Sequence, residues 1–262
     1  MSGEWLTKAF AEHSIAWFAI STVLGGVVGA ATTLLFEDVI KPRIAFRREM
    51  RRVYARYREP LLGAANSLER QINTIVRNRG NAWLHDEYYR LSTFYKFGTF
   101  LFWVGEIESK FGFLEMSSSK KARAFVRRLF GPFAGLSSIR RYQLSAATAL
   151  PRDIARAIGE DMAVESGSRG GPIGFASFVR KYAQDEQFIR WYRQLDLLLD
   201  AVARAPSADH LERLVVTGAQ LKLLVRFLDP GGTYVGGGVS NLDVIERQSL
   251  REALERDVAD AK

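Results

Sequence analysis

The chain of 262 residues contains no cysteine and only three histidines. Without cysteine it can form no disulfide, no thiolate metal site and no cysteine nucleophile, and this lack of thiols suits a cytoplasmic domain. His13, His85 and His210 lie far apart, and none has a second histidine four residues away. Asp86 and Glu87 follow His85, but consecutive helical residues point in different directions and cannot close on one ion. The sequence therefore predicts no metal site and no cofactor.

Recognisable catalytic motifs are also missing. No serine elbow, kinase set or phosphate-binding loop is present. The C-terminal glycines predict a link between elements, because no Lys-Ser/Thr pair follows them and no strand pattern precedes them; they are Gly231, Gly232, Gly236, Gly237 and Gly238. Three neighbouring acid pairs are better explained as solvated helix faces than as acid–base pairs; they are Glu106 with Glu108, Glu160 with Asp161, and Asp185 with Glu186. An enzyme whose site is assembled from distant residues stays open.

No stretch alternates apolar and polar residues as a half-buried strand does. Apolar residues recur instead at spacings of three and four, as in Leu61, Ala65, Leu68, Ile72 and Ile75. This periodicity predicts an all-α fold, with one N-terminal membrane helix followed by a multi-helix bundle. The predicted bundle helices cover residues 44–78, 92–115, 117–133, 150–165, 175–205 (one helix or two), 208–228 and about the last 20 residues.

Proline and glycine mark several expected boundaries in these helices. Pro60 predicts a break or kink in the first helix, and Gly131-Pro132 predicts the end of the helix that begins near residue 117. Ser207 is a candidate N-cap for the helix that follows it. The C-terminal helix is strongly charged, so we expect it to dock loosely.

One long apolar run is present, the 22 uncharged residues from Ile15 to Phe36. At about 1.5 Å per residue it reaches roughly 33 Å, enough for a hydrocarbon core of about 30 Å. The preceding residues include Glu4, Lys8 and Glu12, which do not form the basic region of a signal peptide. The run therefore predicts a transmembrane anchor. A second apolar run, residues 97–105, has only nine residues between Lys96 and Glu106 and predicts a buried bundle helix instead.

Basic residues follow the predicted anchor and set its orientation. Residues 41–58 contain eight Lys or Arg and one acid, whereas the N-terminal flank has one Lys. Because basic flanks stay on the cytoplasmic side, we expect a single-pass inner-membrane protein with its N-terminus outside and its large C-terminal part in the cytoplasm. Anionic lipid headgroups are the nearest polyanion to this segment, so the sequence favours lipid over nucleic acid as its partner. The candidate lipid-binding residues here are Lys41, Arg43, Arg47, Arg48, Arg51 and Arg52.

A second basic run lies in residues 120–141, with seven Lys or Arg and no acid. Its helix carries apolar residues on one face and basic residues on the other, so it could lie on a membrane surface. An ordinary bundle helix with a solvated basic face explains the same pattern. The additional candidate lipid-binding residues are Lys120, Lys121, Arg123, Arg127 and Arg128.

Small residues recur every four positions within the predicted anchor. They are Ser21, Gly25, Gly29 and Thr33. Such rows let the backbones of two membrane helices approach closely. We therefore expect the anchors to associate and the protein to be a homo-oligomer.

These features divide the chain into five parts. They are a short external tail (1–14), the transmembrane helix (15–36), a basic juxtamembrane helix (37–58), a cytoplasmic helical domain (59–229), and a Gly-rich link with a charged C-terminal helix (230–262).

Several apolar and aromatic blocks resemble those of an uncharacterised family of bacterial proteins. The blocks are "YREPLLGAANSLERQINTI", "STFYKFGTFLFWVGEIESKFGFLE", "ARAIGEDM", "FVRKYAQDEQFIRWYRQLD" and "LLVRFLDPGGTYV", between about residues 50 and 235. The resemblance implies an N-terminal membrane segment followed by a helical region, and it implies no activity, cofactor or catalytic residue.

The role that the sequence favours is a membrane-anchored scaffold, adaptor or sensor that binds an unknown protein partner at the cytoplasmic face. An oligomerising effector that perturbs the bilayer is the second interpretation, and a membrane-bound enzyme with an unrecognised site is the third.

The predicted topology can be tested in bacterial cells whose outer membrane is permeabilised and whose inner membrane is intact. Protease added from outside should leave the C-terminal part of the full-length protein uncut, because the basic residues after the anchor hold that part in the cytoplasm. Cleavage of the C-terminal part under these conditions would reverse the assigned orientation.

Overall fold

The computed structural model describes residues 41–78, 82–110, 120–137, 139–164, 170–204, 208–233, 242 and 245–259, and up to residue 54 it describes the backbone alone. Within these residues the chain is helical and has no strand beyond an isolated bridge between Ala163 and Pro172, which confirms the all-α prediction. The helices are α2 (Lys41–Arg77), the 3-10 helix η2 (Ala82–His85), α3 (Glu87–Lys110), α4 (Lys120–Leu136), α5 (Arg152–Asp161), α6 (Phe175–Gln184), α7 (Glu186–Arg204), α8 (Ala208–Leu228) and α9 (Gln248–Ala259).

The chain divides into two compact units, Met1–Arg56 and Tyr57–Lys262. In the described residues, no helix combines the length and the apolar character needed to cross a membrane. The predicted transmembrane segment 15–36, with Ser21, Gly25, Gly29 and Thr33, lies outside the described residues.

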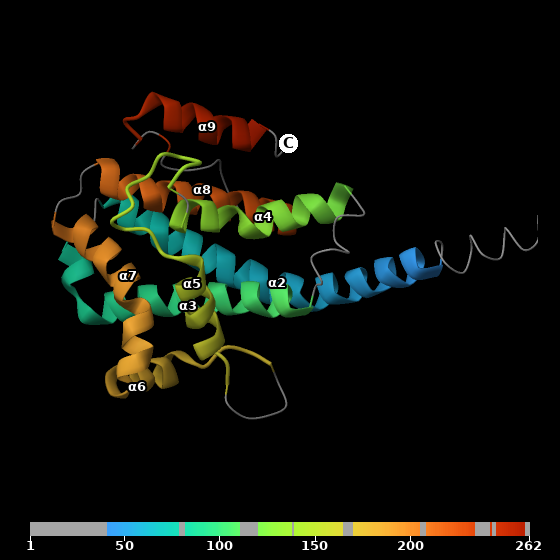
Figure 1. Cartoon of the computed structure of the whole chain (residues 1–262), viewed down its shortest axis with the longest axis horizontal. Helices are drawn as coiled ribbons and strands as arrows, with labels where there is room; N and C mark the ends of the chain where they lie inside the picture. The colour runs from blue at the N-terminus through green and yellow to red at the C-terminus, as the bar shows by residue number, and fades with distance from the viewer. Residues whose placement is uncertain are drawn as a thin grey trace, which may run out of the picture. The chain divides into compact units, whose positions relative to one another are not determined.

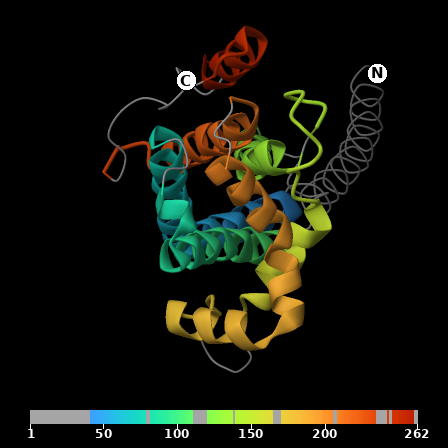
Figure 2. The same cartoon turned by 90° about the vertical axis from the view of Figure 1, so that its left-hand side faces the viewer.

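Helices α2 and α3 lie side by side in opposite directions in the second unit (Figures 1 and 2). The apolar stripe predicted for α2 is buried: Leu61, Ala65, Leu68 and Ile72 have no exposed surface. The helix continues through Pro60 without a break. In α3 the residues Phe97, Phe100, Leu101 and Phe102 are buried, so the short apolar run is a packing helix, as predicted.

Helix α4 packs along α8, and this contact corrects a predicted boundary. The expectation that Gly131-Pro132 ends the helix is wrong, because α4 continues through Pro132 to Leu136. A Cβ on Gly131 would lie 2.5 Å from Gln220 Oε1, and a Cβ on Gly135 would lie 2.7 Å from the Thr217 backbone N. The two glycines, four residues apart, therefore let α8 approach closely, and this packing outweighs their weak helix propensity.

Helix α8 is buried around its whole circumference, and every residue from Leu211 to Val225 is buried. It contacts α4, α7 and α9, and its Lys222 also forms an ion pair with Glu69 of α2 at 3.9 Å. Five of its buried side chains are polar: Glu212, Arg213, Thr217, Gln220 and Lys222. Buried polar groups need partners, so these five side chains set which elements can surround α8.

Arg213 is 1 % exposed and reaches from α8 to the end of α4 and the segment after it. Its Nη1 donates to the backbone oxygens of Gly135 at 2.7 Å and Leu136 at 2.8 Å, and its Nη2 donates to that of Ser145. Burial lowers the pKa of Arg213. The carbonyls at the C-terminal end of α4 carry partial negative charge and offset the cost of burying this cation.

The C-terminal helix α9 is docked more firmly than its charge suggested. Leu250 and Leu254 are buried, which is the apolar contact that the high charge of the segment obscured. Asp257 accepts hydrogen bonds from Tyr142 Oη at 2.6 Å and from Gln220 Nε2 at 2.7 Å. The expectation of a loosely docked helix is therefore not met in residues 248–259.

Helices α6 and α7 pack against α3 through an aromatic cluster that contains Phe94, Phe178, Tyr182, Phe188 and Tyr192. Tyr192 is 0 % exposed. The segment forms two helices because Asp185 stands between them. Its Oδ1 accepts hydrogen bonds from the backbone N–H groups of Gln187 at 2.9 Å and Phe188 at 3.0 Å, which caps α7.

Replacing Arg213 tests the importance of its contacts. We expect Arg213→Met to lower the free energy of unfolding by about 3 kcal/mol, because three backbone oxygens lose a charged donor inside the protein. Arg213→Lys should also destabilise, since an ammonium group cannot reproduce the planar fork. Chemical denaturation of the full-length protein in mild detergent measures both effects; an unchanged midpoint for Arg213→Met would contradict this role.

Candidate functional site

The basic residues predicted to bind lipid fall into two groups. Lys41, Arg43, Arg47, Arg48, Arg51 and Arg52 lie on the described backbone of α2, and their side chains lie outside the described part. In α4 the residues Lys120, Arg123 and Arg127 are exposed, whereas Arg128 is buried at 9 % exposure; the side chain of Lys121 is not described. Arg128 therefore does not share the solvated face on which the sequence placed it.

The acids and histidines considered for catalysis are dispersed. Within the described segments, no group of three His, Asp or Glu side chains comes together in a geometry that could hold a metal ion. His85 is exposed at the end of η2, and Asp86 accepts a hydrogen bond from the Tyr89 backbone N at 2.7 Å, which caps α3. Asp161 forms an ion pair with Lys181 at 3.6 Å.

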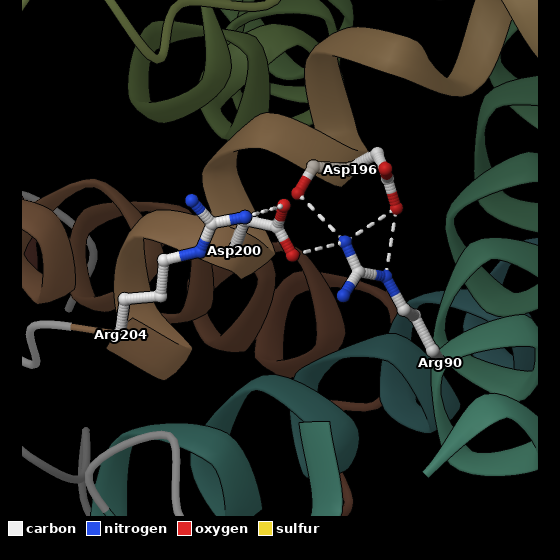
Figure 3. Close-up of polar contacts among 4 residues, drawn as sticks. All are labelled: Arg90, Asp196, Asp200 and Arg204. Carbon is white, nitrogen blue, oxygen red and sulfur yellow. Dashed lines mark hydrogen bonds and ion pairs between the residues drawn. The ribbon is translucent and has the colours of Figure 1, made fainter. Parts of the chain in front are cut away.

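Arg90 connects α3 to α7 through two carboxylates (Figure 3). Its Nε donates to Asp196 Oδ1 at 2.7 Å, and its Nη2 donates to Asp200 Oδ1 at 2.6 Å. Arg204 also donates to Asp200, at 3.2 Å, from an exposed position. Burial alone would lower the pKa of Arg90, but its hydrogen bonds with Asp200 and Asp196 raise it. These charges are already paired, so the cluster joins two helices rather than offering a binding site.

A cavity of about 540 Å³ lies between α3 and α5. Phe102 and Gly105 line it together with Glu106, Glu108 and Glu160. Glu108 already forms ion pairs with Arg156 at 3.0 Å and Arg152 at 3.4 Å. The fold thus brings Glu160 beside two acids far away in the sequence, but in the described structure no further feature of this cavity indicates a ligand.

A smaller surface cavity of about 280 Å³, open to solvent, lies between α2 and α3 and is strongly polar. Six of its residues come from one face of α2 at helical spacings, and the seventh, Lys96, comes from α3; the α2 residues are Gly63, Asn66, Ser67, Arg70, Gln71 and Thr74. The lining contains two cations and no carboxylate. We refer to it below as the α2–α3 cavity.

Lys96 is half-buried and is held by a chain of hydrogen bonds. Its Nζ donates to Gln71 Oε1, and Gln71 Nε2 donates to Thr93 Oγ1 at 2.8 Å. Thr93 Oγ1 in turn donates to the Tyr89 backbone oxygen at 2.9 Å. Burial lowers the pKa of Lys96. The fold therefore holds a partly desolvated ammonium group in a fixed direction.

Sequence reasoning missed this cavity. From the sequence, Lys96 was considered only as one of the two charged residues that bound the apolar run 97–105. A signal was present in α2, where polar residues recur from Asn66 to Thr74 on the side opposite the apolar stripe. Nothing in the sequence shows that Lys96, on another helix, lies next to these polar residues of α2.

Comparison of the chain with protein-family models, curated proteins and solved structures found no match. Function is therefore inferred from the residues of this chain.

The contacts of Arg90 can be compared with those of Arg204. We expect Arg90→Met to lower the free energy of unfolding by about 1–3 kcal/mol, because two partly buried carboxylates lose their common donor. Arg204→Met removes an exposed ion pair within one helix and should change the free energy by less than about 0.5 kcal/mol. Thermal denaturation of both variants measures the difference; equal effects would show that the link between α3 and α7 adds nothing.

Proposed function

We propose that the protein is a single-pass membrane-anchored scaffold, adaptor or sensor whose helical unit binds a protein partner at the cytoplasmic face of the inner membrane. The observation that carries the proposal is the order of segments, an uncharged run of 22 residues followed at once by a basic segment. Anionic lipids are the proposed partner of that basic segment, since each basic residue near such a surface contributes about 1 kcal/mol.

The continuity of α2 supports a coupling between anchor and bundle. The helix runs from Lys41 to Arg77, so the basic segment and the first packing element of the second unit belong to one helix. Along the chain, no loop separates the basic segment from this packing element between residues 41 and 77.

Exposed aromatic side chains support a partner-binding role for the bundle. Trp83 is 53 % exposed and Tyr88 is 69 % exposed, and both lie where η2 leads into α3. Trp83 stacks edge-to-face on Tyr89, and Tyr88 does so on Phe175 of α6, with ring centroids 5.6 Å apart in each pair. Aromatic side chains held in this way are typical anchors of protein interfaces.

A photo-reactive amino acid in place of Tyr88 tests this role in the natural host cell. We expect one discrete cross-linked product with a second protein, because the proposed role places the exposed side chain at position 88 against a partner. A probe at Val164, 49 % exposed on a different segment, is the matched control and should give no such product. Trp83→Ser should reduce the yield at position 88 severalfold.

The same cells distinguish the bilayer-perturbing alternative, which the row of small residues in the predicted anchor favours. Induced full-length protein should leave the cells impermeable to a membrane-excluded dye. The bilayer-perturbing effector would be favoured over the scaffold by two results together. The full-length protein would admit the dye while the Gly25→Ile/Gly29→Ile variant would not, and no cross-linked partner would form at position 88.

A further inference from the structure

The lining of the α2–α3 cavity contains two positive charges and no carboxylate. Within the described residues, neither Lys96 nor Arg70 forms an ion pair, and the cavity lining contains no acid. The adjacent Glu69 is not part of the lining. It forms an ion pair with Lys222 of α8 and accepts a hydrogen bond from Asn73 Nδ2. Arg70 is exposed, whereas Lys96 is partly removed from water. A partly buried cation is normally paired, so Lys96 leaves room for a negative partner from outside the chain, which the exposed Arg70 can also reach.

Gly63 at the edge of the cavity is not explained by packing. It lies inside α2, where glycine costs about 1 kcal/mol relative to alanine. A Cβ built on Gly63 would meet no atom within 4 Å, in contrast to Gly131 and Gly135, whose missing side chains admit α8. Gly63 lines the cavity at an exposed position, so a side chain added there would occupy space that is now open to solvent.

Neutral donors stand beside the two cations. Asn66 and Ser67 lie one turn of α2 before Arg70, and all three line the cavity. Ser67 supplies a hydroxyl donor, Asn66 an amide donor and Arg70 a planar fork, while Lys96 supplies a point charge held by Gln71. Oxygen atoms of a tetrahedral anion are recognised by such a mixture of charged and neutral donors.

The geometry points to a binding site for a phosphoryl oxyanion, either phosphate itself or the phosphate group of a small monoester. The two cations of the lining match the charge of about −1.5 to −2 that a phosphate monoester carries at neutral pH. The volume of about 280 Å³ is just below the usual range of roughly 300–1,000 Å³ for ligand pockets, which suits a single phosphate with a short organic body. This site is independent of the membrane-anchored role proposed above.

Isothermal titration of the full-length protein in a maltoside detergent with inorganic phosphate, at ionic strength held constant with sodium chloride, tests the site. We expect saturable binding of one phosphate per chain. Lys96→Met and Arg70→Gln should each weaken binding at least tenfold, and Gly63→Leu should abolish it by filling the cavity. Lys110→Met, which removes an exposed lysine of the same helix outside the cavity, should bind as the wild type does.

Melting temperatures separate loss of the site from loss of the fold. Lys96→Met should stay folded with a slightly lowered melting temperature, because Gln71 Oε1 loses a donor while burial already disfavours the charged form of Lys96. Gly63→Leu should stay folded, since its Cβ meets no neighbour. Absence of saturable phosphate binding in the wild type, or equal binding by the wild type and a folded Gly63→Leu variant, would overturn the proposal.

The source of the phosphate group is decided by two further ligands, glycerol 3-phosphate and a short-chain phosphatidic acid below its micellar concentration. Both should compete with inorganic phosphate for the same site. If the phosphatidic acid binds at least tenfold more tightly than glycerol 3-phosphate, the ligand is a lipid headgroup. If glycerol 3-phosphate binds as tightly as the phosphatidic acid or more tightly, the ligand is a soluble phosphate compound. Failure of both to compete with bound phosphate would identify inorganic phosphate itself as the ligand.

Discussion

The burial of α8 on every side is the constraint on which the rest of the second unit depends. A helix without a solvated face must find partners within the protein for each of its polar side chains. Arg213 binds the backbone at the end of α4, Gln220 binds Tyr142 and Asp257, and Glu212 forms an ion pair with Arg247 at 2.6 Å. Segments distant in the sequence are therefore joined through one helix, and α9 is docked by polar contacts as much as by its two leucines.

Several charged side chains that could be taken for catalytic groups form ion pairs within the protein. Arg90 with Asp196 and Asp200, and Glu108 with Arg152 and Arg156, stabilise contacts between helices. Lys96 and Arg70 differ because the lining they share contains no acid. The half-buried ammonium group of Lys96, which has a neutral partner and no acid in the lining around it, is the physical basis of the proposed oxyanion site.

The proposed anchor and the proposed oxyanion site depend on different properties of the chain. The predicted anchor depends on the length of an uncharged segment and on the charge of its flanks. Both properties can be read along the sequence, and they determine how a segment inserts into a bilayer. The proposed oxyanion site depends on the side chains that α2 and α3 bring together when they pack. Helix α2 carries both the basic segment and one wall of the cavity, so a ligand bound there would contact the helix that leads to the predicted anchor.

The sequence by itself determined the helical class, the apolar stripe of α2 and the buried character of α3, because a period of 3.6 residues requires no knowledge of the neighbours. It also shows the uncharged run and its basic flank. The continuation of α4 through Pro132 was decided by tertiary packing, since α8 packs along a helix that local propensity would have ended. The burial of Arg128 is likewise seen only in the folded chain. Lys96 meets the polar face of α2, 25 residues from its partner Gln71, only because the two helices are antiparallel neighbours. The polar residues of α2 recur at helical spacing, but nothing in the sequence shows which residue of α3 meets them, and for that reason the cavity could be found only in the folded protein.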